Sequence, residues 1–246
     1  MYAEIIFRPN GLRSTRIYAD QARSMVGKAL DGVACNPLLF NRDANGKTLN
    51  EIHGHIKDGA GWALPPAVVY DGGLGFIRVY GIGQAGIDVV QSEAAKIFAG
   101  LMRDHGPVAI EMRTGKAVIE QTGYLVPHHI RWLVVGKTPK VCYTDPVSDA
   151  RIQGVIRRHI VNGLLGQCAL LGGDAGGSIP RDTDVEILEG EPTKALAIQN
   201  GVPVSAYRNV VFAMPVRLKG PWMAGHLRAR GYGMIRAVDP TRGEAA

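Results

Sequence analysis

The first 115 residues alternate between strand-like and helix-like stretches, and the order of these stretches restricts the fold more than any other feature of the sequence. Strands are predicted at YAEIIF (2–7), PLLFNRD (37–43), GFIRVYG (75–81) and PVAIEM (107–112), where apolar, β-branched and aromatic residues gather. Apolar residues recur at helical spacing over residues 18–31 and 87–104, which predicts two helices. The order β-α-β-β-α-β is that of a ferredoxin-like domain, an antiparallel sheet with two helices on one face.

The remaining residues predict a second domain that also mixes strands with a helix, so the expected fold class is α+β. Paired strands are expected at 116–123 and 124–136, and further strands at 183–190, 202–218 and 234–238. A helical segment is expected over about 146–172, with Asp145 as its cap and Pro146 in its first turn. The predicted domains are therefore residues 1–115 and 116–246.

Composition excludes several classes of protein. No apolar run approaches a membrane span, and the N-terminus has no signal-peptide pattern, so a cytoplasmic protein without a membrane partner is expected. The three cysteines, Cys35, Cys142 and Cys168, are too far apart to indicate a disulfide framework or a zinc site. No carboxylate cluster suited to magnesium is apparent, so neither a metal nor a cofactor is predicted.

The basic residues favour a nucleic-acid partner. The net charge is +6, and 19 of the 28 basic residues are arginines, which bind phosphate through planar, bidentate contacts better than lysine does. The charge gathers towards the two ends of the chain, in residues 8–28 and 207–246. A GC-rich genome would also raise the arginine content, and that explanation stays open.

A glycine-rich basic loop, residues 220–233, precedes the last predicted strand. Glycine permits positive φ and close approach to backbone amides. We expect Gly225, Gly231 and Gly233 to bend the loop so that its amides face phosphate, while Arg228 and Arg230 project from the same side of an extended segment and supply charge. Arg236 in the following strand extends this RNA-binding set. The alternative is a tight turn with no ligand.

The helical segment offers a second RNA-binding surface. Arg151 and Arg158 are seven residues apart and share a helix face, and Arg157 lies about 100° away from Arg158. This basic edge could contact the phosphates of an RNA hairpin, because the deep major groove of A-form RNA admits little base reading. An ordinary amphipathic surface helix is the alternative.

A competing motif is VYGIGQAG, in which Gly81, Gly83 and Gly86 match the G-x-G-x-x-G of dinucleotide-binding proteins. That motif opens a parallel β-α-β unit. Here two strands and a helix precede it, so a glycine-rich turn before a packed helix is the preferred interpretation. An NAD(P)-binding oxidoreductase stays as an alternative function.

With MYAEIIFRPNG leading into the first helix, PLLFNRD after it and VVFAMPVRLKGPWMAGHLRARGYGMIR near its end, the chain resembles the RAMP superfamily of CRISPR-associated RNA-binding proteins. Within it, the chain is similar to the endonuclease that processes CRISPR repeat RNA, in its type IV variant. The resemblance implies two ferredoxin-like, RRM-like domains with a C-terminal glycine-rich loop and a helical insertion. It also implies an antiviral endoribonuclease that cuts repeat RNA into crRNA, stays bound to the hairpin and joins other subunits of a CRISPR ribonucleoprotein.

The chemistry implied by this resemblance is metal-independent attack by the RNA 2′-hydroxyl. Many family members carry a histidine near the first helix, whereas residues 10–35 here contain none, although His53 and His55 follow in a loop. Arginines that stabilise developing phosphate charge are the candidate catalytic residues, namely Arg16, Arg23 and Arg242. A RAMP subunit that binds guide RNA without cutting it is the alternative function.

Overall fold

The computed structural model describes residues 1–42, 45, 65–136, 145–171, 179–198 and 202–238. The chain forms two compact units. The first comprises Met1–Lys116 with Ala169–Asp174 and Ala229–Gly231, and the second comprises Ala117–Cys168, Ala175–Arg228 and Tyr232–Ala246.

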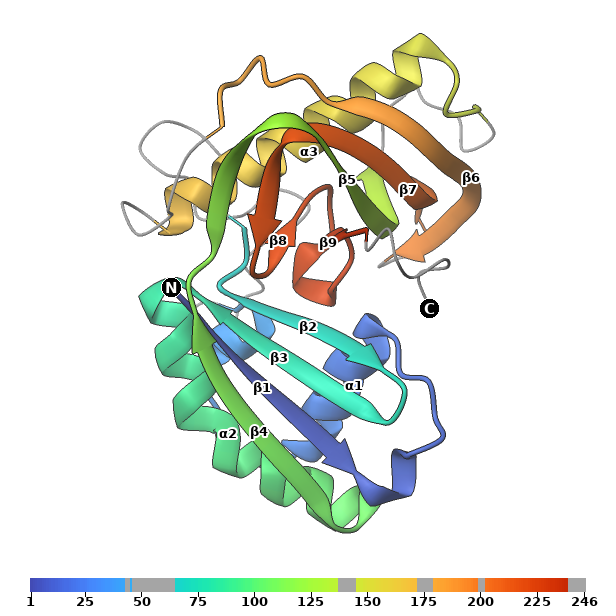
Figure 1. Cartoon of the computed structure of the whole chain (residues 1–246). Coiled ribbons are helices and arrows are strands. Elements are labelled where there is room, and N and C mark those ends of the chain that lie inside the picture. The colour runs from blue at the N-terminus through green and yellow to red at the C-terminus, as the bar shows by residue number, and fades with distance from the viewer. Residues whose placement is uncertain (43–44, 46–64, 137–144, 172–178, 199–201, 239–246) are drawn as a thin grey trace. The chain divides into compact units, whose positions relative to one another are not determined.

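The first unit has an antiparallel four-stranded sheet in the order β2-β3-β1-β4, with both helices on one face (Figure 1). Its elements are β1 (Tyr2–Pro9), α1 (Ala19–Ala29), β2 (Val68–Gly73), β3 (Phe76–Ile82), α2 (Gly83–His105) and β4 (Val108–Gly115). The core lies between sheet and helices and includes Ile5, Phe7, Val26, Ile97 and Leu101, none of which has exposed surface.

The predicted order β-α-β-β-α-β is present, but the prediction of a strand at PLLFNRD is wrong. Pro37–Phe40 form a 3-10 turn, and the second strand is β2, in residues that the sequence analysis left unassigned. The Asn36 side chain accepts a hydrogen bond from the Leu38 amide, and Asn41 closes the turn with a φ of 58°. These capping interactions therefore favour a turn here, in place of the strand that the apolar run predicts.

The glycines of VYGIGQAG pack α2 against the sheet. A Cβ on Gly81 would overlap the Gly86 carbonyl oxygen, and one on Gly86 would overlap the Ala67 carbonyl oxygen. Strand β3, which precedes α2, pairs antiparallel with both β1 and β2. These residues form no parallel β-α-β unit, so the dinucleotide-binding interpretation is wrong and the glycine-rich turn is the better one.

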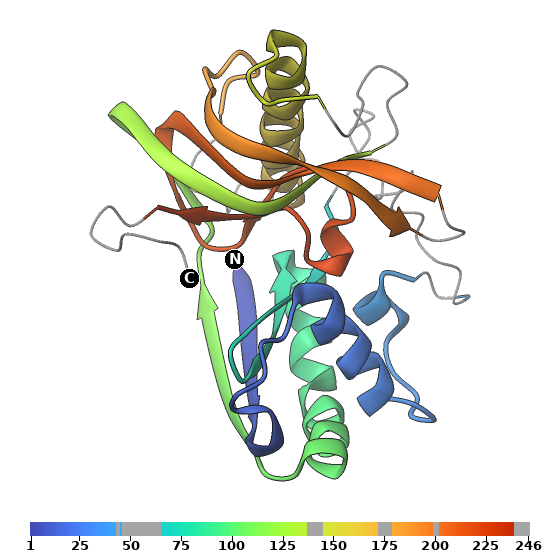
Figure 2. The same cartoon turned by 90° about the vertical axis from the view of Figure 1, so that its right-hand side faces the viewer.

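The second unit has a five-stranded antiparallel sheet in the order β6-β7-β5-β9-β8 and one long helix (Figure 2). Its elements are β5 (Val118–Gly136), α3 (Ala150–Leu171, of which residues up to Cys168 belong to this unit), β6 (Glu186–Ile198), β7 (Val202–Lys219), β8 (Trp222–Met223) and β9 (Met234–Ala237). Residues 116–123 and 124–136 were expected to pair with each other. Instead they form the single strand β5, which pairs with β7 and shifts register between Gln121 and Val126.

Helix α3 is continuous, and its glycines do not divide it. The buried residues Ile152, Ile156, Ile160 and Leu164 recur every four residues and form its core-facing side. Gly163 allows close packing, because a Cβ there would lie 2.6 Å from the Met223 carbonyl oxygen. The expected cap Asp145 is wrong, since Asp149 accepts the Arg151 amide at 2.7 Å.

No helix in the described part of the chain is long and apolar enough to cross a membrane.

Candidate functional site

A pocket of about 420 Å³ opens in the first unit and gathers three arginines from separate parts of the sequence. Its lining consists of Asp20, Arg23, Ser24, Gly27, Phe40, Arg42 and Arg230. Three arginines and one aspartate line it, so the pocket carries an excess of positive charge beside an aromatic ring. This combination suits a phosphate group with an attached planar base.

Helix α1 contributes four of the lining residues because of their spacing. Asp20, Arg23, Ser24 and Gly27 are three or four residues apart in sequence and so share one side of the helix. The opposite side carries Ala22, Val26 and Ala29, which are buried in the core. Burial of the apolar side therefore turns the polar side of α1 towards the pocket.

The 3-10 turn at Pro37–Phe40 is fixed to α1 and β2 by two hydrogen bonds. Arg23 donates from Nη2 to the Phe40 carbonyl at 2.9 Å, and the Tyr70 hydroxyl donates to the Leu39 carbonyl at 2.6 Å. Burial raises the pKa of the Tyr70 phenol far above its usual value, so Tyr70 stays neutral and keeps this proton. The turn thus holds Phe40 and Arg42 at the pocket.

Sequence reasoning found Arg23 and Arg230 but missed Phe40 and Arg42. The pair Asn36-Pro37 was the available signal, because asparagine before proline is typical of the first residues of a helical turn. A turn there, in place of a strand, would have directed attention to the two residues that follow it.

The glycine-rich loop differs from the expected extended segment. Arg228–Arg230 form a 3-10 turn, so the prediction that the Arg228 and Arg230 side chains project together from an extended chain is wrong. Arg228 is buried, with 5% of its surface exposed, whereas Arg230 is partly exposed and lines the pocket. Of these two residues, only Arg230 lines the arginine pocket, the pocket that it forms with Arg23 and Arg42.

The loop glycines have the positive φ values that the sequence suggested, but they pack against protein. Gly225, Gly231 and Gly233 have φ values of 76°, 83° and 79°. The Gly233 amide donates to the Trp132 carbonyl at 2.8 Å, so the expectation that this amide faces phosphate is wrong. A Cβ on Gly231 would overlap the Tyr70 carbonyl oxygen and Ala19, which explains the glycine next to Arg230.

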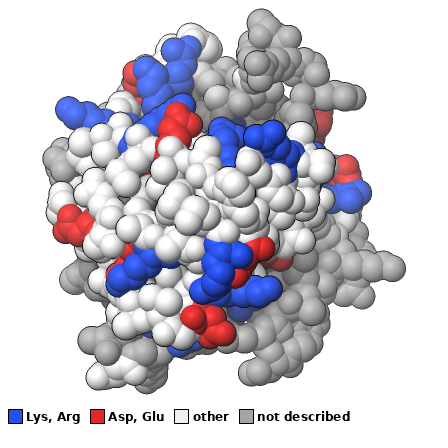
Figure 3. All heavy atoms as spheres, turned by 90° about the horizontal axis from the view of Figure 1, so that it is seen from below, with Lys and Arg blue, Asp and Glu red and all other residues white. Residues whose placement is uncertain are grey.

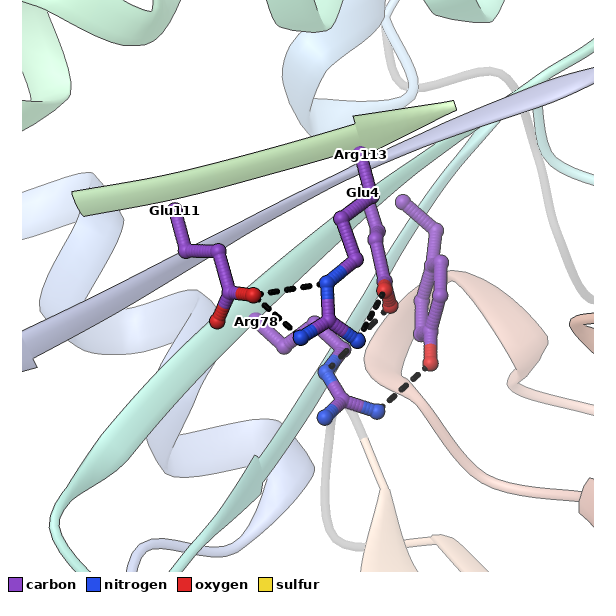
Figure 4. Close-up of polar contacts among 5 residues, drawn as sticks. Glu4, Arg78, Glu111 and Arg113 are labelled. Atoms are coloured by element: carbon purple, nitrogen blue, oxygen red, sulfur yellow. Dashed lines mark hydrogen bonds and ion pairs between the residues drawn. The ribbon is translucent and has the colours of Figure 1, made fainter. Parts of the chain in front are cut away.

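A second group of arginines lies on the helix-free face of the first sheet, but its charges are balanced (Figure 4). Glu4 is 3.6 Å from Arg78 and 3.9 Å from Arg113, and Glu111 also pairs with Arg113. Arg78 donates to the Tyr80 hydroxyl at 2.8 Å. The network joins neighbouring strands and occupies its arginines, so it offers less to an anion than the pocket does.

The surface charge in the view from below is also mixed (Figure 3). On the described part of this face, several blue basic groups stand next to red acidic groups, with uncharged surface between them. The charge on this face therefore does not single out a binding site, and the candidate site remains the pocket in the first unit.

Comparison with known proteins identifies the family. The model of a family described as "Type IV CRISPR-associated endonuclease Csf5" matches residues 9–240. The chain belongs to this family. No match was found among curated proteins.

Solved structures agree with the family in fold. The structure "Csf5, CRISPR-Cas type IV Cas6 crRNA endonuclease" is 19% identical to the chain, with a TM-score of 0.70 over 97% of this chain and 99% of the other. A crystal structure of Cas6b is 16% identical, with a TM-score of 0.59 over 97% and 100% of the two chains. The predicted RAMP membership and α+β fold of two ferredoxin-like domains are confirmed.

The α3 arginines of this Csf5-family chain differ in how far they are already engaged. Arg151 pairs with Asp145 at 2.6 Å and with Asp149 at 3.6 Å, and Arg157 donates from Nε to the Val185 carbonyl at 2.9 Å. All three residues are exposed, and Arg158 takes part in no ion pair or side-chain hydrogen bond among the described residues. All three residues stay predictions for RNA binding, and the Arg158 guanidinium is the one least engaged by the protein.

Other predicted residues do not line the pocket, or they lie outside the described residues. Arg16 is exposed, forms a β-bridge with Leu74 and does not line the pocket. Arg236 is exposed on β9, paired in register with His129. Arg242, like the loop histidines His53 and His55, lies outside the described residues. The catalytic roles of Arg16 and Arg242 stay predictions.

Two histidines that seemed unrelated in sequence meet in the second unit. The rings of His159 and His226 lie edge to face with their centroids 5.0 Å apart. The pKa of the His159 imidazole is lowered to about 3, chiefly by burial and secondly by the neighbouring His226, while a hydrogen bond with the Val135 backbone opposes the shift. Arg158 and Arg228 also disfavour a charge on this ring.

This depressed pKa predicts that the second unit loses stability in acid. Below the unfolded value of 6.5, the unfolded chain binds a proton that folded His159 resists, so the free energy of unfolding falls as pH falls from 6.5 towards 3. The loss at pH 5 is expected to reach about 2 kcal/mol. Urea unfolding at pH 7 and pH 5 measures it. His159→Gln should flatten this dependence and His105→Gln should not; equal profiles for both variants would contradict the prediction.

Proposed function

We propose that the protein is an endoribonuclease that binds CRISPR repeat RNA and cleaves it to give crRNA. The arginine pocket carries this proposal: Arg23, Arg42 and Arg230, drawn from three segments, face one open site beside Phe40. Membership of a family of CRISPR-associated endonucleases supports the same function. The name of one structural relative includes "crRNA endonuclease", which directs the choice of substrate.

The proposed reaction uses the RNA's own nucleophile. The 2′-oxygen bonds to the adjacent phosphorus and loses its proton, while the bond from phosphorus to the 5′-oxygen breaks and that oxygen gains a proton. The products are a 2′,3′-cyclic phosphate and a 5′-hydroxyl. Because attack is intramolecular, holding the nucleotide in line lowers the barrier, and arginines stabilise the charge that develops on the phosphate oxygens.

A 2′-deoxy substrate tests the proposal. We expect the protein to cleave labelled repeat RNA in EDTA and leave a cyclic phosphate or 3′-phosphate end. One deoxynucleotide placed 5′ of the cut should abolish cleavage while binding persists, since only the nucleophile is lost. Gel separation of the products and a filter-binding assay measure the two effects. Undiminished cleavage of the deoxy substrate would exclude this mechanism, and binding without cleavage of any repeat would indicate a non-catalytic RAMP subunit.

We further propose that α3 contacts the phosphates of the repeat hairpin through Arg158. The matched control is Arg151, which occupies the same helix but is paired with two aspartates. Arg158→Ala should weaken hairpin binding and reduce the slope of log affinity against log salt by about 0.7–0.9, the value of one phosphate contact. Arg151→Ala should change the slope less. Equal slopes for the parent and Arg158→Ala would show that α3 has a packing role only.

A further inference from the structure

We propose that the arginine pocket selects guanine at a nucleotide flanking the cut, with Asp20 as the residue that recognises the base. This inference rests on the proposed function and adds the base specificity of the same site. The pocket holds two kinds of group: the guanidinium groups suit the phosphate, whereas Asp20, Ser24 and Phe40 are suited to a base.

Asp20 is the observation that carries the proposal. Asp20 is exposed in the first turn of α1 and lines the same pocket as three arginines. Among the ion pairs and side-chain hydrogen bonds of the described residues, none engages this carboxylate. Arg23, one turn away, donates instead to the Phe40 carbonyl. Both carboxylate oxygens therefore remain available as acceptors.

The chemistry of a carboxylate singles out guanine. An ionised aspartate only accepts hydrogen bonds, and its two oxygens accept two parallel donors best. Guanine presents adjacent N1–H and N2–H donors on its Watson–Crick edge. Adenine and cytosine present one amino group beside an unprotonated ring nitrogen, and uracil presents one N–H between two carbonyl groups. Only guanine satisfies both oxygens without placing an acceptor against a negative charge.

Phe40 and Gly27 give the base an apolar surface. The Phe40 ring is stacked nearly parallel to the Tyr70 ring, with an interplanar angle of 9° and centroids 6.4 Å apart. A Cβ on Gly27 would lie 3.7 Å from the edge of the Phe40 ring, which is ordinary contact. Glycine at this position thus leaves space beside the ring, and a larger side chain would occupy it without backbone strain.

An acidic residue in the first turn also stabilises a helix through the helix dipole. The experiment must therefore separate this structural role of Asp20 from its proposed recognition of the base. Single-turnover cleavage is measured for substrates with each of the four bases at each position flanking the cut, and with inosine in place of guanosine. Inosine lacks the N2 amino group. The parent should prefer guanosine at one position at least tenfold, and inosine should remove most of that preference.

The variants assign the preference to Asp20. Asp20→Asn should reduce the preference for guanosine over inosine to less than threefold, whereas Asp31→Asn, just beyond α1 and outside the pocket, should retain it. Gly27→Leu should weaken cleavage of every substrate by filling the space beside Phe40. Equal parental rates with guanosine and inosine, or an unchanged preference in Asp20→Asn, would overturn the inference.

Failure of the proposed function gives a different result. A parent protein that cuts no substrate would refute the endonuclease. The dissociation constants of the same guanosine and inosine RNAs, compared for parent and Asp20→Asn, then test base recognition alone. Identical ratios for the two proteins would refute the role of Asp20 in binding as well.

Discussion

Arg23→Ala is expected to slow single-turnover cleavage of repeat RNA about 100- to 1000-fold, the effect of removing one donor that stabilises transition-state charge. Arg23 is half-buried in α1 and faces the pocket, and its bond to the Phe40 carbonyl fixes the guanidinium. Binding should change much less, because many phosphates contribute to affinity. Rates at saturating protein separate the chemical step from binding. Arg23→Lys should recover only part of the rate, since lysine lacks the planar fork.

The matched control is Arg113→Ala. Arg113 is also an arginine of the first unit, but it belongs to the balanced network on the helix-free sheet face, paired with Glu111 and near Glu4 (Figure 4). Its removal should change the cleavage rate less than threefold. Arg16→Ala tests the other arginine near α1, and the geometry of the pocket predicts a smaller effect there than at Arg23. An Arg23→Ala rate within threefold of the parent would remove this residue from the active centre.

The order of elements in the first unit was predictable because each element buries its own periodic apolar residues. Ala22, Val26 and Ala29 define α1, and Ile5 and Phe7 define β1, whatever the rest of the chain does. The second strand was misplaced for the opposite reason. PLLF has strand-like composition, but the Asn36 cap and the left-handed Asn41 form a turn there, and Arg23 and Tyr70 hold that turn through hydrogen bonds.

The pocket was only partly predictable, because it depends on long-range geometry. Arg23 and Arg230 are more than 200 residues apart, and sequence spacing cannot bring them together. The glycine-rich loop was predicted from the sequence, but the packing role of its glycines was not. They accommodate neighbouring carbonyls of the protein, such as that of Tyr70 beside Gly231. Likewise, the ion pairs that engage Arg151 become visible only once Asp145 and Asp149 are placed around it.

Gly231→Ala is expected to destabilise the protein and to disturb the arginine pocket. Its φ of 83° costs a non-glycine residue about 1–3 kcal/mol. The added Cβ would also overlap the Tyr70 carbonyl oxygen and Ala19, which forces β2, α1 or the loop to move at a further cost of about 1–3 kcal/mol. Since Arg230 precedes this residue, the movement should also withdraw its guanidinium from the pocket and slow cleavage.

Gly32→Ala isolates the backbone contribution to this effect. Gly32 has a similar φ of 72°, but a Cβ there would meet nothing within 4 Å. Chemical denaturation should show a smaller loss of stability for Gly32→Ala than for Gly231→Ala, and cleavage should stay at the parental rate. If the two variants lose the same stability and both cleave normally, the packing of the loop against Tyr70 does not position Arg230. If Gly231→Ala alone loses cleavage at a temperature where it remains folded, the glycine acts on the site through its neighbouring arginine.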